Sequence, residues 1–151
     1  MGDLVSACNE LEEISAENRI HPAVLVMRYE IYAKAGRWNY AAELAQTLVT
    51  ILPNDAEAWL NLAVTTRMKK GGGVDEAKRI LLVAQVKFPN EYLIPYHLAC
   101  YAAQLGDLEE SKQWFTKAME IDTKAVQRIS LDDPDLKPLW DSMSGTIWKR
   151  E

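Results

Sequence analysis

Residues 56–91 read AEAWLNLAVTTRMKKGGGVDEAKRILLVAQVKFPNE, and this stretch decides the fold class. Apolar residues recur every three or four positions on both sides of the Gly71–Gly73 run, which places them along one face of an α-helix. Asn54 or Asp55 can cap the first helix, with Glu57 completing a capping box. The stretch therefore predicts two amphipathic helices that are joined by a glycine turn and closed by a proline.

Similar helix pairs precede and follow this stretch. Pro22 begins a first pair, which turns at Gly36 and stops at Pro53. The third pair, YLIPYHLACYAAQLGDLEESKQWFTKAMEID, has its turn at Gly106, and Asp107 can cap its second helix. Its one proline falls in the first turn of a helix, where the missing amide hydrogen is tolerated. The chain is therefore a repeat protein.

The three units align position by position, with small residues where two helices cross and large residues beside them. The small residue that opens the second helix is Ala41, Ala77 and Ser111, and the closing position is Pro53, Pro89 and Thr123. This pattern resembles the tetratricopeptide repeat, a helix–turn–helix unit of about 34 residues. The resemblance implies an all-α fold in which repeats stack into a right-handed superhelix, because one repeat cannot bury its apolar face alone.

We predict a single domain over residues 1–143. It comprises an N-terminal capping half-repeat (1–21), repeats at 22–55, 56–91 and 92–123, capping helices at 124–143, and a frayed tail at 144–151. The first capping helix is indicated by an apolar stripe of Ala125, Val126 and Ile129.

Composition excludes some classes of partner. Apolar residues make up 48% of the chain and the formal net charge is −5. A nucleic-acid partner is disfavoured because phosphate binding needs a basic surface. Two cysteines that are far apart fit free thiols in a reducing compartment. No stretch resembles a signal peptide or approaches the roughly 18 apolar residues of a membrane span. We therefore expect a cytoplasmic protein that has no membrane partner.

Three clusters suggest chemistry, and each has a plainer interpretation. The Gly71–Gly73 run lacks the rest of a phosphate-loop motif and follows a helix, which favours a flexible turn. The acids of Asp132–Asp135 lack the spacing of a calcium loop and fit helix capping. His97 and Cys100 share a helical face, but no orienting group or oxyanion site accompanies them. We expect no catalysis, no cofactor and no metal.

The tetratricopeptide resemblance implies a concave groove lined by the first helix of each repeat. Its expected lining is apolar in the middle, with an aromatic residue at one end and few charges at its rim. These residues are Val26, Met27, Glu30 and Lys34 in the first repeat, Leu60, Asn61, Val64, Arg67 and Met68 in the second, and Leu93, Tyr96, His97, Cys100 and Gln104 in the third.

The resemblance implies that a peptide or helical segment of another protein binds in this groove. Asn61 matches one residue of the carboxylate clamp that binds the acidic tails of heat-shock chaperones. The other clamp positions hold Val26, Glu30, Leu93 and His97, so a basic or apolar segment is the better expectation. Two alternatives stay open: a chaperone that is similar to the three-repeat secretion chaperones of bacteria, and a homo-oligomerisation module that associates weakly through its end helices.

Overall fold

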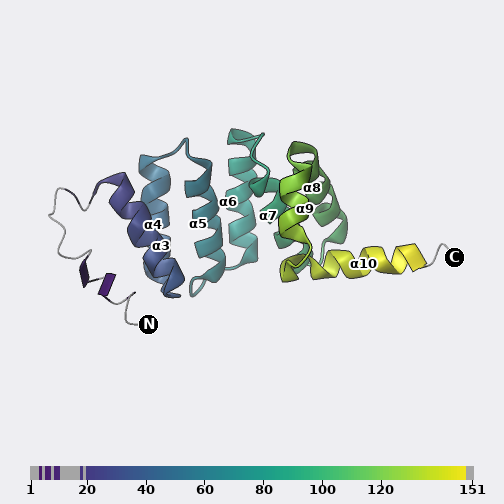
Figure 1. Ribbon diagram of the computed structural model, residues 1–151, viewed down its shortest axis with the longest axis horizontal. Helices are drawn as coiled ribbons and strands as arrows, with labels where there is room; N and C mark the ends of the chain where they lie inside the picture. Colours follow the sequence, from purple (N-terminus) through teal and green to yellow (C-terminus); the bar gives the residue numbers. More distant parts are fainter. Residues whose placement is uncertain (1–3, 5, 8, 11–17, 19, 149–151) are drawn as a thin grey trace. The chain divides into compact units, whose positions relative to one another are not determined.

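The structure is a computed structural model that describes residues 4, 6, 7, 9, 10, 18 and 20–148, with side chains up to residue 144 (Figure 1). In this part of the chain, regular structure is helical and no strand occurs, which confirms the all-α fold class. The predicted capping half-repeat at 1–21 lies largely outside the described residues.

Backbone proximity divides the chain into two compact units, 1–73 and 74–151. The first contains α3 (Pro22–Lys34), α4 (Trp38–Ile51) and α5 (Ala56–Met68). The second contains α6 (Val74–Lys87), α7 (Leu93–Gln104), α8 (Leu108–Ile121), α9 (Thr123–Ser130), the 3-10 turn η1 (Pro134–Leu136) and α10 (Lys137–Trp148). The boundary falls at the end of the glycine run, inside the second predicted repeat. The single-domain description stays a prediction.

In the first unit, α4 packs against both α3 and α5 (Figure 1). The side of α4 that faces its neighbours carries small residues, and Ala41 and Ala45 have no exposed surface. Small side chains let helix backbones approach closely, and Leu48 fills the space beside them. The start of α5 is fixed by the predicted cap, since the Asp55 carboxylate accepts a hydrogen bond from the Glu57 amide at 3.0 Å.

In the second unit, α7 is the central helix and packs against α6 and α8. Its core side chains Ile94, Leu98 and Ala99 have no exposed surface. The small-residue position of the third repeat has an added role: Ser111 Oγ donates a hydrogen bond to the Ala99 carbonyl at 2.8 Å. A buried hydroxyl needs such a partner, and this bond ties α8 to α7 where they cross.

The turn between α7 and α8 follows the predicted chemistry. Gly106 has a φ of +84°, the left-handed region that a side chain disfavours. Asp107 then caps α8, its carboxylate accepting from the Glu110 amide at 3.0 Å.

The C-terminal end differs from expectation in one respect. The apolar-striped helix is present as α9, with Ala125 and Val126 buried. However, α10 continues through Trp148, into the segment that we predicted as a frayed tail. No proline interrupts this segment, and one interior glycine costs a helix only about 1 kcal/mol. Figure 1 shows the last turns of α10 extending beyond α8 and α9.

Candidate protein-binding surface

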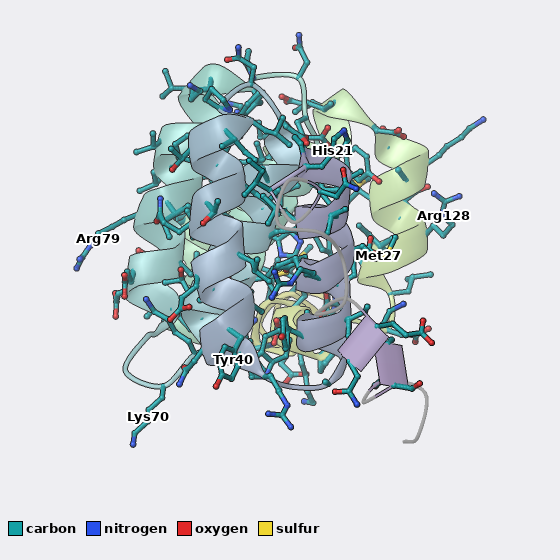
Figure 2. All side chains as sticks on the ribbon, turned by 90° about the vertical axis from the view of Figure 1, so that its left-hand side faces the viewer. His21, Met27, Tyr40, Lys70, Arg79 and Arg128 are labelled. Carbon is teal, nitrogen blue, oxygen red and sulfur yellow. The ribbon has the colours of Figure 1, made fainter. Side chains whose placement is uncertain are left out.

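Several side chains on the first helices of the two repeats in the first unit are exposed or half-buried. Met27 is 52% exposed and lies on the side of α3 turned away from α4 (Figure 2). Glu30 and Lys34 on the same helix are also exposed, and Val26 is half-buried. Helix α3 begins at Pro22, with the His21 ring accepting a hydrogen bond from the Ala23 amide. On this side of α3, the exposed Met27 is followed by two exposed charged residues, Glu30 and Lys34.

The predicted lining continues on α5, whose last residue, Met68, also lines a hollow with residues 36–40 and Lys70. Met68 is 48% exposed, and Asn61, Val64 and Arg67 are half-buried. Leu60 is only 8% exposed and belongs to the core of the unit. We use the term α3–α5 face for Val26, Met27, Glu30, Lys34, Asn61, Val64, Arg67 and Met68.

Tyr29 joins the two helices of the face. Its phenol is directed at the Asn61 carbonyl, with 3.5 Å between the two oxygens, a long and weak hydrogen bond. Burial raises the pKa of Tyr29 from 10.0 to about 12, and the carboxylates of Glu57 and Glu30 add to the shift. Both carboxylates disfavour the charged form of the phenol, so Tyr29 stays protonated over the physiological pH range.

This pKa predicts a loss of stability in alkali. The folded state holds the Tyr29 proton more tightly than the unfolded chain does. The contribution of protonated Tyr29 to the free energy of unfolding is therefore complete below pH 10 and is lost as the pH rises toward 12. The full shift corresponds to at most roughly 3 kcal/mol, and solvent screening lowers this value. Urea unfolding of the wild type and Tyr29→Phe at about pH 9 and pH 11.5 measures it. The wild type should lose more stability than the variant over this range, and equal losses would contradict the assignment.

The α7 positions of the predicted groove differ in exposure, and two of the five are buried. Tyr96 is 3% exposed and Cys100 is 2% exposed, whereas Leu93 and His97 are half-buried and Gln104 is exposed. The covering segment comes from the same chain. The Tyr96 phenol donates to Asp133 Oδ2 at 2.5 Å, and Gln104 Nε2 donates to the Asp135 carbonyl at 2.9 Å. These positions therefore share one face of α7, and the stretch before α10 lies on it.

The structure adds no support for chemistry at His97 and Cys100. The Cys100 thiol is buried beside the Asp133 carboxylate, 3.8 Å from Sγ to Oδ2, which leaves no access for a substrate. The His97 ring contacts the rings of Tyr96 and Tyr101, with centroids 5.8 and 6.1 Å apart. Among the described residues, no three His, Cys, Asp or Glu side chains form a group that could hold a metal ion.

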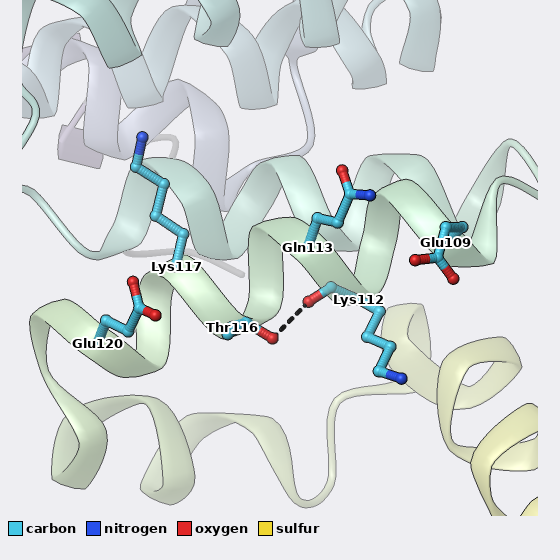
Figure 3. A pocket seen from close by; sticks show the side chains of 6 residues that line it. All are labelled: Glu109, Lys112, Gln113, Thr116, Lys117 and Glu120. Atoms are coloured by element: carbon cyan, nitrogen blue, oxygen red, sulfur yellow. Dashed lines mark hydrogen bonds between the residues drawn. The ribbon is translucent and has the colours of Figure 1, made fainter.

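Two hollows in the second unit were not foreseen from the sequence. One is an open strip along α8, lined only by charged and polar side chains: Glu109, Lys112, Gln113, Thr116, Lys117 and Glu120 (Figure 3). Its residues all come from one helix, and the hydrogen bond drawn there joins Thr116 to the backbone of Lys112 within that helix. The strip is a solvated helix face.

The other hollow is apolar and has a volume of about 310 Å³. Helices α8 and α10 form one wall, where the Phe115 and Trp140 rings meet edge to face with centroids 5.1 Å apart. The side chain of Leu131, 78% exposed, lies at its edge. In the sequence, Leu131 and Trp140 only fall in the same predicted capping segment, so nothing there indicated this hollow.

Every helix in the described part of the chain is too short or too polar to cross a membrane. Comparison with known proteins gives matches at the level of structure alone: no protein-family model and no curated protein matches the chain.

The structural matches include tetratricopeptide-repeat proteins. TTC0263, a thermophilic tetratricopeptide-repeat protein of Thermus thermophilus, is 20% identical with a TM-score of 0.71, over 94% of this chain and 75% of that one. MamA residues 41 to the end, from Desulfovibrio magneticus RS-1, is 19% identical with a TM-score of 0.70, and the match covers 87% of this chain and 70% of that one. The type III secretion chaperone SycD of Yersinia enterocolitica, solved with a peptide of the translocator YopD, is 22% identical with a TM-score of 0.62. This match covers 92% of this chain and 99% of SycD. These likenesses show that the chain has the tetratricopeptide-repeat fold.

Proposed function

We propose that this chain is a non-catalytic, cytoplasmic protein-interaction scaffold that binds a peptide or helical segment of a partner protein on the α3–α5 face. The observation that carries the proposal is the pair of half-exposed methionines, Met27 and Met68, on two first helices of the repeats. Methionine is flexible and polarisable, so a surface built from it adapts to different apolar side chains. SycD, which has the same fold, was solved with a bound peptide, and this supports the same use here.

The charges of the α3–α5 face suggest the character of the partner segment. Glu30 and Glu57 lie near Tyr29, and the basic residues of the face are Lys34 and Arg67. An amphipathic segment whose apolar side chains contact Met27 and Met68, with a basic residue near Glu30, fits this arrangement. Nucleic acid does not fit an acidic chain of this composition.

A second candidate function is that of a secretion-type chaperone. The structural match covers 99% of SycD and 92% of this chain, so the likeness extends over nearly the whole of both molecules. A chaperone of this type would hold an extended segment of a secreted partner on the same face. Self-association through the end helices is a further alternative, and light scattering on the purified chain would detect it.

Replacing Met27 by glutamate should abolish partner capture. A charge on the face would be desolvated in the complex, so we expect at least about a tenfold loss of bound partner. The experiment is capture from a lysate of the source organism on immobilised chain, read by mass spectrometry. Ile51→Glu is the matched control, since Ile51 is 43% exposed on α4 of the same unit.

A partner that is retained by the wild type and Ile51→Glu but lost from Met27→Glu would support the proposal. Capture that is equal with all three proteins would exclude the α3–α5 face. Substitutions at Leu60 or Tyr96 would be poorer probes, because both side chains are buried and a charge there would disturb the fold itself.

A further inference from the structure

One face of α7 contacts a short segment from later in the same chain. Tyr96, Cys100 and Gln104 follow one another at intervals of four residues, so their side chains lie in one row along the helix. All three are directed at the same short segment, residues 131–136, which connects α9 to α10. We call this row the α7 row and the segment the acidic turn; its sequence is Leu-Asp-Asp-Pro-Asp-Leu.

Asp133 is the central residue of the acidic turn, and its two carboxylate oxygens have different roles. Oδ1 accepts from the Asp135 amide at 2.9 Å and so caps the 3-10 turn. Oδ2 accepts from the Tyr96 phenol at 2.5 Å, with Cys100 Sγ at 3.8 Å. One oxygen thus shapes the turn while the other attaches it to α7. Neither asparagine nor a shorter side chain offers two acceptor oxygens in this arrangement.

The remaining contacts fix the turn at both ends. The Tyr96 phenol also lies 3.2 Å from the Ile129 carbonyl, and Gln104 Nε2 donates to the Asp135 carbonyl. Leu136 supplies an apolar anchor that has no exposed surface. By contrast, the neighbouring Leu131 is 78% exposed and Asp132 is exposed. The turn is therefore held through the Asp133 side chain, the Asp135 carbonyl and the buried side chain of Leu136.

The donors of the α7 row carry no charge. Helix α7 contains no lysine or arginine, and burial and the hydrogen bond to Asp133 raise the pKa of Tyr96 well above its usual value. The phenol therefore stays protonated and acts as a fixed neutral donor. Recognition of this kind depends on geometry and only weakly on salt, unlike binding to a basic patch.

We propose that the α7 row is a recognition site for an acidic turn, that residues 131–136 fill it as an intramolecular ligand, and that a partner segment with the same chemistry binds by displacing them. That chemistry is a carboxylate-capped Asp-Pro turn followed by leucine. The inference rests on the proposed function, which it extends from the α3–α5 face to the second unit. The acidic turn then acts as an autoinhibitory contact, because the partner reaches the row only in the fraction of molecules in which the turn has detached.

The thiol of Cys100 reports this detachment. In full-length chain carrying Cys8→Ser, Cys100 is the only thiol, and its rate of alkylation by iodoacetamide measures how often the row is uncovered. A carboxylate hydrogen bond stabilises the closed form enough that Asp133→Ala should speed alkylation at least about tenfold. Asp132→Ala is the matched control, since this neighbouring acid is exposed, and its rate should equal that of the wild type.

Recognition is tested with a labelled peptide of residues 129–139, ISLDDPDLKPL, added to the full-length Asp133→Ala chain. The peptide should bind saturably in fluorescence anisotropy, slow the alkylation of Cys100, and bind little less tightly in about 0.5 M salt. The same peptide carrying Asp133→Ala should not bind. If Asp133→Ala fails to fold, as judged by circular dichroism, Asp133→Asn takes its place because it keeps the volume of the side chain.

Two results would overturn the inference. Alkylation of Cys100 that is equally slow in Asp133→Ala and the wild type would show that the turn does not detach. Fast alkylation without peptide binding would show an opening that recognises nothing. Neither result depends on Met27, so failure here differs from failure of the α3–α5 proposal, which is measured by partner capture alone.

Discussion

A Leu81→Ala chain should be less stable than the wild type by about 3 kcal/mol. Leu81 has no exposed surface, and the alanines one turn before and after it, Ala77 and Ala84, are equally buried. Truncation removes three carbons from a site whose small neighbours cannot move in to fill the space, so a cavity should remain. Urea unfolding followed by circular dichroism measures the loss.

The adjacent leucine provides a control of identical chemistry. Leu82 is 38% exposed on the same helix, so Leu82→Ala should cost less than about 1 kcal/mol. In repeat proteins each helix pair is stabilised by its contacts with adjacent helices. Hydrogen exchange should therefore report the Leu81→Ala effect most strongly in α6 and α7. Equal losses from the two substitutions would contradict the assignment of Leu81 to the core.

Gly72→Ala should also have a large effect, through the backbone. A Cβ atom at this position would lie 1.9 Å from the Thr66 carbonyl oxygen, far inside contact distance. Thr66 is buried at the end of α5 and cannot yield easily, so the turn must change its course. We expect a loss of about 2–4 kcal/mol in the stability of the first unit, measured by urea unfolding with hydrogen exchange on the α5 amides.

Gly73→Ala is the matched control for this substitution. No atom lies within 4 Å of the Cβ that Gly73 would gain, and its φ is not positive. Removing a glycine from such a position should stabilise the chain by about 0.5 kcal/mol, because the unfolded state loses freedom. If Gly72→Ala and Gly73→Ala behave alike, the close approach to Thr66 is not a constraint in solution.

The local structure could be predicted from the sequence in detail. Helix ends followed from single residues: Asp55 and Asp107 cap the helices that we assigned to them, and Asp133 caps the 3-10 turn where we expected helix capping. These features depend on hydrogen bonds that reach two or three residues along the chain, so a local pattern is sufficient. Gly72 marks the limit. The sequence predicts a flexible turn for the glycine run, and only the folded structure shows how closely Gly72 approaches Thr66.

The candidate site was predictable only in part. Helical spacing identified which residues share a face, and α7 does present Tyr96, Cys100 and Gln104 together. Spacing does not say what lies opposite that face. Asp133 is nearly forty residues further along the chain than Tyr96, and such a contact depends on how the last helices fold back. Leu60 shows the same limit: helical spacing assigned it to the groove lining, but its side chain is only 8% exposed and belongs to the core.

The exposure of Met27 and Met68 has a consequence for the life of the protein in the cell. Oxidation converts methionine to its sulfoxide, which places a polar oxygen on a side chain that had been apolar and adaptable. Two half-exposed methionines within one candidate binding surface are open to that reaction. A scaffold that binds through them would lose affinity under oxidative stress and regain it through sulfoxide reductases. The exposure that lets Met27 and Met68 contact a partner thus also makes binding depend on the reduction of methionine sulfoxide.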